Sequence, residues 1–180
     1  MSRYVLTGAP GSGKTALLRL LEVDGYAVVE EAATDVIALD QALGRAEPWH
    51  DHDFTDRVVN LQRRRQVRAG AAASVFFDRS PVCTLALSRF LGHTTSSLLA
   101  REVDRVVAEG VYEQTVFFVR QQGFVEATAA RRISFEDSVV FERLHEETYR
   151  ELGFELVELP AGPLAERAAL VRDTVERLPR

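Results

Sequence analysis

Eight residues near the beginning of the chain have the types and the spacing of a phosphate-binding loop. Gly8-Ala9-Pro10-Gly11-Ser12-Gly13-Lys14-Thr15 follows the pattern GxxxxGKT and lies between an apolar run at 4–6 and a stretch with helical periodicity at 16–21. Glycines allow the backbone to wrap around a phosphate with its N–H groups pointing inward. Lys14 would place a positive charge near the β- and γ-phosphates of a nucleotide, and Thr15 would offer a hydroxyl to Mg²⁺. The alternative is an ordinary glycine-rich turn with a solvated lysine.

Lys14 is the only lysine of the chain, although the sequence contains 22 lysine and arginine residues. Lysine carries a compact ammonium, and at a phosphate site it is not interchangeable with arginine. The choice of lysine at this one position therefore favours a phosphate-binding loop over a turn. The same count excludes a Ras-like GTPase, because the Asn-Lys-x-Asp motif that reads guanine needs a further lysine.

Asp78 and Arg79 follow the apolar residues 75–77 and could act on the same phosphates. A carboxylate after a buried strand can hold Mg²⁺ directly or through water, with Thr15 as the other protein ligand. The alternative for Asp78 is a cap on the helix that follows. The planar guanidinium of Arg79 could bind phosphoryl oxygens, or it could form a structural ion pair.

Glu30 and Glu31 end another predicted strand, and two adjacent carboxylates are unfavourable there without a cation or a task. One of them could accept the proton of an attacking hydroxyl, as phosphoryl transfer requires. Alternatively, a glutamate could simply begin the next helix, where negative charge is favourable. We expect one glutamate to be functional and the other to be structural.

Arg131 and Arg132 lie just before a long helix predicted at 135–152, in the section where a closing lid would be expected. Arginines on a closing segment stabilise charge on the transferred phosphoryl group and help to exclude water. The alternative is a solvated pair of surface arginines.

Other conspicuous residues fit structural roles. His50-Asp51-His52-Asp53 looks like a metal cluster, but adjacent ligands in a loop point apart, and Asp53 suits the N-cap of the helix that follows. Trp49 could either touch a substrate or pack a loop onto the core. We expect Cys83 to be a small buried apolar residue on a helix and His145 to lie on a solvated helix face.

Strand and helix patterns alternate along the chain and must position these residues. Apolar runs predict strands, and helical periodicity separates them, which indicates an α/β fold with a parallel sheet covered by helices on both faces. The predicted strands are 4–6, 26–29, 74–77, 115–119 and 154–157, and the predicted helices are 16–21, 32–43, 54–69, one opened by Pro81, 97–109, 135–152 and 164–178. Ligands of such sheets gather at the carboxyl ends of the strands, where the phosphate loop, Glu30-Glu31, Asp78-Arg79 and Arg120 meet.

The bulk composition is that of an ordinary soluble protein, and 180 residues suit a single domain, 1–180. The net charge of −5 argues against a general nucleic-acid binder. No apolar run is long enough to cross a membrane, no signal-peptide pattern precedes the first strand, and the one cysteine forms no internal disulfide. We therefore expect a cytoplasmic location.

Six motifs in this order resemble a family of small AAA-type phosphate-loop ATPases and kinases, which is related to nicotinamide-riboside kinase domains and to deoxynucleoside kinases. The motifs cover nearly the whole chain: GAPGSGKT (8–15), VVEEAA (28–33), EPW (47–49), FFDRSP (76–81), RRISFED (131–137) and ELGFELVELP (151–160). The resemblance implies a three-layer P-loop fold with a five-stranded parallel sheet of order 2-3-1-4-5 and a small lid.

The resemblance also implies roles for individual residues. In deoxynucleoside kinases a glutamate that ends the second strand acts as a base, and Glu31 matches it best. A Glu-Arg-Ser triplet ends the third strand there, and Asp78-Arg79-Ser80 stands in for it here. The lid arginines carry over to Arg131-Arg132. Gln62 and Gln66 suggest themselves for reading a base, without a motif that supports them.

Together these observations predict an enzyme that binds ATP and Mg²⁺ and transfers a phosphoryl group to a hydroxyl of a small metabolite, which could be nucleoside-like. A regulatory ATPase that acts through a protein partner is the alternative. We expect a small-molecule substrate, no nucleic acid and no membrane partner, and a homodimer is left open.

Overall fold

The computed structural model describes residues 1–70, 72–123 and 134–178. At least one helix separates each strand from the next, as the sequence predicts. The elements are β1 (Ser2–Thr7), α1 (Lys14–Val23), β2 (Ala27–Val29), α2 (Ala32–Ala42), the 3₁₀-helix η1 (Pro48–His50), α3 (Phe54–Arg68), β3 (Ser74–Asp78), α4 (Pro81–Phe90), α5 (Ser97–Ala108), β4 (Thr115–Val119), α6 (Phe135–Glu151), β5 (Glu155–Leu159) and α7 (Leu164–Arg177).

The five strands form one parallel sheet of order β2-β3-β1-β4-β5, which confirms the predicted order. β1 lies at its centre, where Val5 pairs with Phe77 of β3 on one side and with Val116 of β4 on the other. Every residue of β4 is buried, because a central strand of a parallel sheet is covered on both faces.

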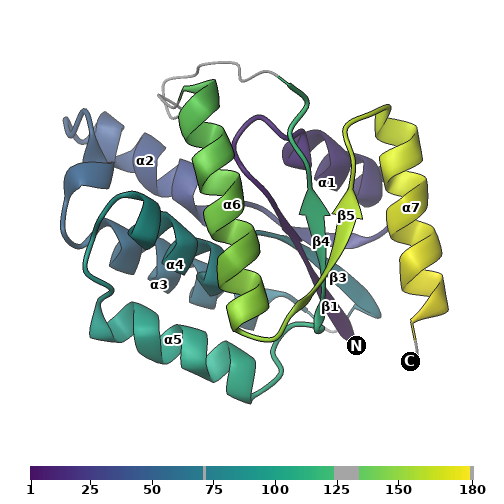
Figure 1. The fold of residues 1–180 in the computed structure, drawn as a ribbon. Coiled ribbons are helices and arrows are strands. Elements are labelled where there is room, and N and C mark those ends of the chain that lie inside the picture. The colour runs from purple at the N-terminus through teal and green to yellow at the C-terminus, as the bar shows by residue number, and fades with distance from the viewer. Residues whose placement is uncertain (71, 124–133, 179–180) are drawn as a thin grey trace.

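Helices cover both faces of the sheet, so the protein has three layers (Figure 1). Side chains alternate along a strand, and the two sets in β1 therefore enter different cores. Tyr4 and Leu6 pack with residues of α1 and α7. Val5 packs on the other face with residues of α4, α5 and α6, among them Tyr149.

Local sequence signals explain several element boundaries. Pro81 opens α4, as expected for a residue that donates no backbone hydrogen bond. Ser96 accepts a hydrogen bond from the backbone N–H of Leu99 and so caps α5. Among the described helices, none is both long and apolar enough to cross a membrane.

Candidate active site

The phosphate loop connects β1 to α1 and depends on glycine at its first position. Gly8 has φ +131°, and a Cβ there would lie 2.3 Å from the carbonyl oxygen of Val119 at the end of β4. Gly11 and Gly13 also have positive φ, which lets the loop curl before α1 begins. The loop therefore passes directly over the carboxyl end of the neighbouring strand.

Lys14 is buried at the start of α1 and contacts the loop itself. Its Nζ donates to the carbonyl oxygens of Gly8 and Ala9, both at 2.9 Å, and to the hydroxyl of Ser12 at 3.3 Å. Burial, together with the positive charge of Arg79, lowers the pKa of Lys14 to about 7. A bound phosphate would supply the negative charge that the carbonyl oxygens cannot.

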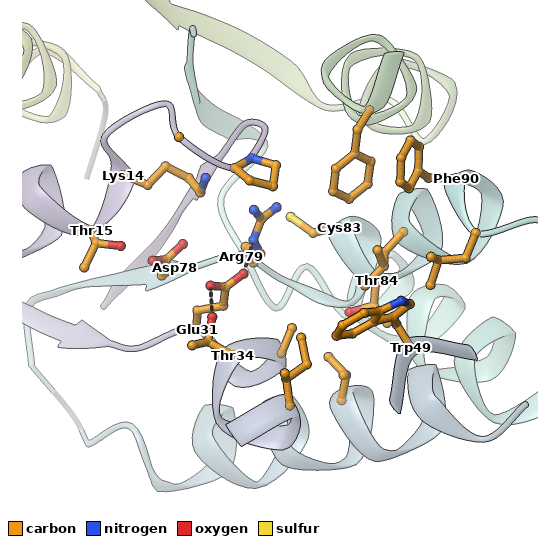
Figure 2. Close-up of a pocket in the computed structure, with 18 of the residues that line it drawn as sticks. Lys14, Thr15, Glu31, Thr34, Trp49, Asp78, Arg79, Cys83, Thr84 and Phe90 are labelled. Atoms are coloured by element: carbon orange, nitrogen blue, oxygen red, sulfur yellow. Dashed lines mark hydrogen bonds and ion pairs between the residues drawn. The ribbon is translucent and has the colours of Figure 1, made fainter. Parts of the chain in front are cut away.

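Asp78 and Thr15 lie beside Lys14 and line the same cavity (Figure 2). Asp78 is the last residue of β3 and is buried. Carboxylate and hydroxyl oxygens are the donors that Mg²⁺ prefers, so this pair fits a Mg²⁺ that is completed by phosphate and water. Among the described residues no three His, Cys, Asp or Glu side chains group into a metal site.

Arg79 follows Asp78 and has the only positive φ, +74°, among the described residues other than glycine. Its side chain is largely buried, and its Nε donates to Oε1 of Glu31 at 2.5 Å. Burial opposes the charge of Arg79, but the carboxylate of Glu31 raises its pKa above the ordinary value. A positive φ at a residue other than glycine costs free energy, and it persists where the surrounding structure holds the backbone in place, often at functional sites.

Glu31 lies at the N-cap position of α2 and faces the cavity. Its Oε2 accepts a hydrogen bond from the hydroxyl of Thr34 at 2.7 Å. Burial would raise the pKa of Glu31, but the charges of Arg79 and Lys14 and the bond from Thr34 bring it down to about 2. Its neighbour Glu30 is exposed and pairs with Arg19.

His145 occupies a different place from the one predicted, because it is fully buried instead of solvated. Its Nδ1 donates to the carbonyl oxygen of Phe141 at 2.8 Å, which leaves Nε2 to accept from Nη1 of Arg79 at 3.0 Å. Burial and the charge of Arg79 hold the pKa of His145 well below its usual value, so the ring is neutral. Arg79 is thus held by Glu31 at Nε and by His145 at Nη1.

The spacing of α6 could have revealed this buried position. Its buried residues recur every three or four positions along one face of the helix. They are Ser138, Phe141, His145, Thr148 and Tyr149.

A cavity of about 590 Å³ extends from the phosphate loop to an apolar end. Figure 2 shows Thr15 and Lys14 at one side and Trp49 and Phe90 at the other, with Arg79 between them. The predicted packing of Trp49 onto the core is confirmed, because its ring lies against the cluster around Phe54. Trp49 also lines the cavity, and its contact with a substrate stays a prediction.

Both glutamine side chains that suggested themselves for base reading bind other protein groups. Gln62 lines the cavity, but its amide donates to the carbonyl oxygen of Ser80 at 3.1 Å and accepts from Thr84 at 2.8 Å. Gln66 accepts from Arg105.

Several further predictions can be compared with the structure. Cys83 is buried on α4, as expected, within hydrogen-bond distance of Thr7 and Tyr149. Asp53 precedes α3 but makes no side-chain cap, because its carboxylate pairs with Arg57. Arg120 forms ion pairs with glutamates, namely Glu142, Glu146 and Glu158. Arg131 and Arg132 lie outside the described residues.

Comparisons with known structures show the same fold. Deoxyadenosine kinase from M. mycoides, solved with the products dCMP and dCDP, is 14% identical with a TM-score of 0.66, covering 98% of this chain and 100% of that one. The NadR protein, solved with NAD and AMP-PNP, is 14% identical with a TM-score of 0.69, covering 99% of this chain. This chain spans about half of NadR, 51% of its length.

Comparison of the sequence with protein families shows the family of this chain. None of the curated proteins compared with the sequence is a significant match. The model of one family, described as an AAA domain, matches residues 3–167, and this range includes the phosphate loop and the residues around Arg79. The chain belongs to this AAA domain family of phosphate-loop proteins, whose fold it shares with deoxyadenosine kinase and NadR.

Proposed function

We propose that this protein is an ATP- and Mg²⁺-dependent phosphotransferase that acts on a hydroxyl of a small metabolite. The observation that carries the proposal is the position of the Glu31 carboxylate, which shares the cavity with Lys14 and is hydrogen-bonded to Arg79. Transfer to an alcohol needs a carboxylate that can orient the hydroxyl next to the phosphate loop. Hydrolysis of ATP needs only a water molecule there, so it would not require the apolar part of the cavity.

The roles of the phosphate-site residues follow from their chemistry. The backbone N–H groups of 8–15 and the ammonium of Lys14 would bind the phosphates of ATP. Thr15 and Asp78 would hold Mg²⁺, which when bound offsets the charge of the phosphates. The fork of Arg79 would donate to the oxygens of the transferred group. Arg131 and Arg132 remain proposed as further donors to the same group.

The transfer itself forms one bond and breaks one. The acceptor oxygen bonds to the γ-phosphorus, the bond from that phosphorus to the bridging oxygen breaks, and ADP leaves. Glu31 accepts a hydrogen bond from the hydroxyl and orients it, and the proton departs toward its carboxylate. A carboxylate with a pKa of about 2 is a weak base, so positioning contributes more than proton abstraction, which suits a loose transition state.

The lining of the far end of the cavity supports a neutral acceptor. Among the described lining residues, the acidic and basic side chains are those of Lys14, Glu31, Asp78 and Arg79 at the phosphate end and that of Asp137, which is exposed. Aromatic and aliphatic side chains make up most of the rest, together with Thr34, Gln62 and Thr84. A ring-bearing metabolite without charge, such as a nucleoside-like molecule, fits these surroundings better than an acid or a phosphate ester.

Two substitutions test the proposal. Lys14→Ala should weaken ATP binding by about tenfold or more, as titration calorimetry would show, because it removes the charge-assisted contact. Glu31→Gln should lower turnover by about 10²–10³-fold and leave ATP affinity nearly unchanged. Full turnover in the Glu31→Gln protein would rule out the role of Glu31 in orienting the hydroxyl of the substrate.

The fate of the γ-phosphate separates transfer from the regulatory alternative. Protein, Mg²⁺ and ATP labelled at the γ-phosphate are incubated with a pool of neutral metabolites. We expect label in a phosphorylated product. Label that appears only in inorganic phosphate, at a rate independent of the pool, would support a regulatory ATPase.

A further inference from the structure

Arg167 in α7 is a buried arginine that has no part in the site described above. Only 4% of its surface is exposed. Its Nη1 donates to the carbonyl oxygen of Ser12 at 2.8 Å, and its Nη2 donates to the carbonyl oxygen of Arg120 at 3.1 Å. The guanidinium therefore joins the phosphate loop to the segment that follows β4.

The charge of Arg167 has no carboxylate partner among the described residues. Its guanidinium donates hydrogen bonds to neutral backbone oxygens, and its Nε is buried without a hydrogen bond. Burial lowers the pKa of Arg167. Arg172, further along the same helix, pairs instead with Asp24. A buried cation is normally paired, since neutral carbonyls do not repay its desolvation. This exception lies beside a loop with the pattern of an anion site.

The contact reaches the peptide that should face the phosphates. A Cβ at Gly13 would lie 3.1 Å from Nη1 of Arg167, so glycine provides the room for the guanidinium. The carbonyl of Ser12 and the N–H of Gly13 belong to one peptide group. A charged donor on the carbonyl polarises that group and makes the N–H a stronger donor.

We propose that Arg167 is part of the nucleotide-binding site, where its positive charge is neutralised by the phosphates of a bound nucleotide. It strengthens phosphate binding through the Ser12–Gly13 peptide and through its own charge. This inference rests on the nucleotide binding proposed above and adds a positioning residue from α7, far from the loop in sequence.

Titration calorimetry of ATP and ADP with three variants of the full chain tests this role. Arg167→Lys keeps the charge, Arg167→Gln keeps a donor without charge, and Arg167→Met keeps neither. We expect the Lys variant to bind ATP within about threefold of the original protein and the Gln and Met variants to bind about tenfold more weakly or worse, with ADP following the same order. Arg172→Met is the matched control and should bind as the original protein does.

Thermal unfolding without nucleotide gives a second readout. Loss of an unpaired buried charge should leave the Tm of the Gln variant unchanged or raise it, while the rise in Tm that ATP causes becomes smaller. A merely structural arginine predicts the opposite, a lower Tm without nucleotide. Wild-type ATP affinity in the Gln or Met variant, or a Lys variant as weak as the Met variant, would overturn the proposal.

Lys14→Ala distinguishes failure of this inference from failure of the proposed function. Unchanged ATP binding in Lys14→Ala would mean that the phosphate loop is not the nucleotide site. Weaker binding in Lys14→Ala with unchanged binding in all Arg167 variants would leave the proposed function in place and remove only the role of Arg167.

Discussion

Arg79 shows how contacts on two sides can hold a side chain and a strained backbone together. Glu31 contacts Nε, and His145 contacts Nη1, while the backbone N–H of Arg79 donates to the carbonyl oxygen of Leu6 at 3.0 Å. A single contact would leave the guanidinium free to rotate. The two side-chain contacts fix the fork in the cavity, and the third fixes the backbone that carries it.

His145 must stay neutral to make its contact with Arg79, and this predicts an acid sensitivity. Its pKa is lowered on folding, so below its ordinary value of 6.5 the unfolded chain binds a proton that the folded chain does not. Stability therefore falls as pH decreases below 6.5. For one group this amounts to at most about 2 kcal/mol at pH 5.

His145→Gln removes the titration and keeps an acceptor for Arg79. We expect the free energy of unfolding, measured with urea, to fall less between pH 7 and pH 5 in this variant than in the original protein, by up to about 2 kcal/mol. All other groups are the same in both proteins, so their contributions cancel in the difference. Parallel pH curves would show that the imidazole carries no proton-linked free energy.

Sequence reasoning identifies the residues that belong to motifs and misses the residues outside the motifs that contact them. Lys14, Glu31 and Arg79 stand in patterns whose spacing indicates chemistry, and the structure brings them to one cavity. His145 and Arg167 belong to no motif, because each contributes through a contact with a residue far away in the chain. Such contacts follow from the packing of α6 and α7 on the sheet, which local patterns do not contain.

The phosphate loop depends on how closely it crosses β4. Gly8→Ala would place a Cβ 2.3 Å from the carbonyl oxygen of Val119, and backbone atoms cannot move aside as a flexible side chain can. We expect this substitution to lower the free energy of unfolding by about 3 kcal/mol or more and to weaken ATP binding.

Gly25→Ala provides a control that separates steric overlap from backbone strain. Gly25 also has a positive φ, +95°, but a Cβ there would meet no atom within 4 Å. We expect a cost of about 1–2 kcal/mol from conformational strain alone and unchanged ATP affinity. Equal costs in the two variants would show that the crossing over β4 is not tight.

Element boundaries were predictable where a local signal marks them. The strand at 115–119 and the opening of α4 by Pro81 agree with the structure. β3 extends one residue further than its apolar run, because Asp78 still pairs in the ladder opposite Leu6. The strand order was not contained in the periodicity and was implied only by the resemblance to a known family.

For the whole molecule, one cavity joins residues from both halves of the chain. Its phosphate end comes from the loop and from the end of β3, and its apolar end comes from η1, α3, α4 and α6. A nucleotide and an acceptor would therefore meet between parts of the fold that are separate in sequence. This arrangement predicts that the two ends can be observed independently.

Trp49 provides a probe for the apolar end, because it is the only tryptophan and lines the cavity opposite Lys14 (Figure 2). We expect ATP alone to leave its fluorescence nearly unchanged, because the phosphate end holds no tryptophan. A neutral ring-bearing acceptor should shift or quench the emission by displacing water from the indole. A carboxylate analogue of the same size should have little effect, since no described cation lines that end. A Trp49→Phe protein supplies the blank. If ATP alone changed the emission and no neutral acceptor did, the nucleotide and not the acceptor would lie beside the indole.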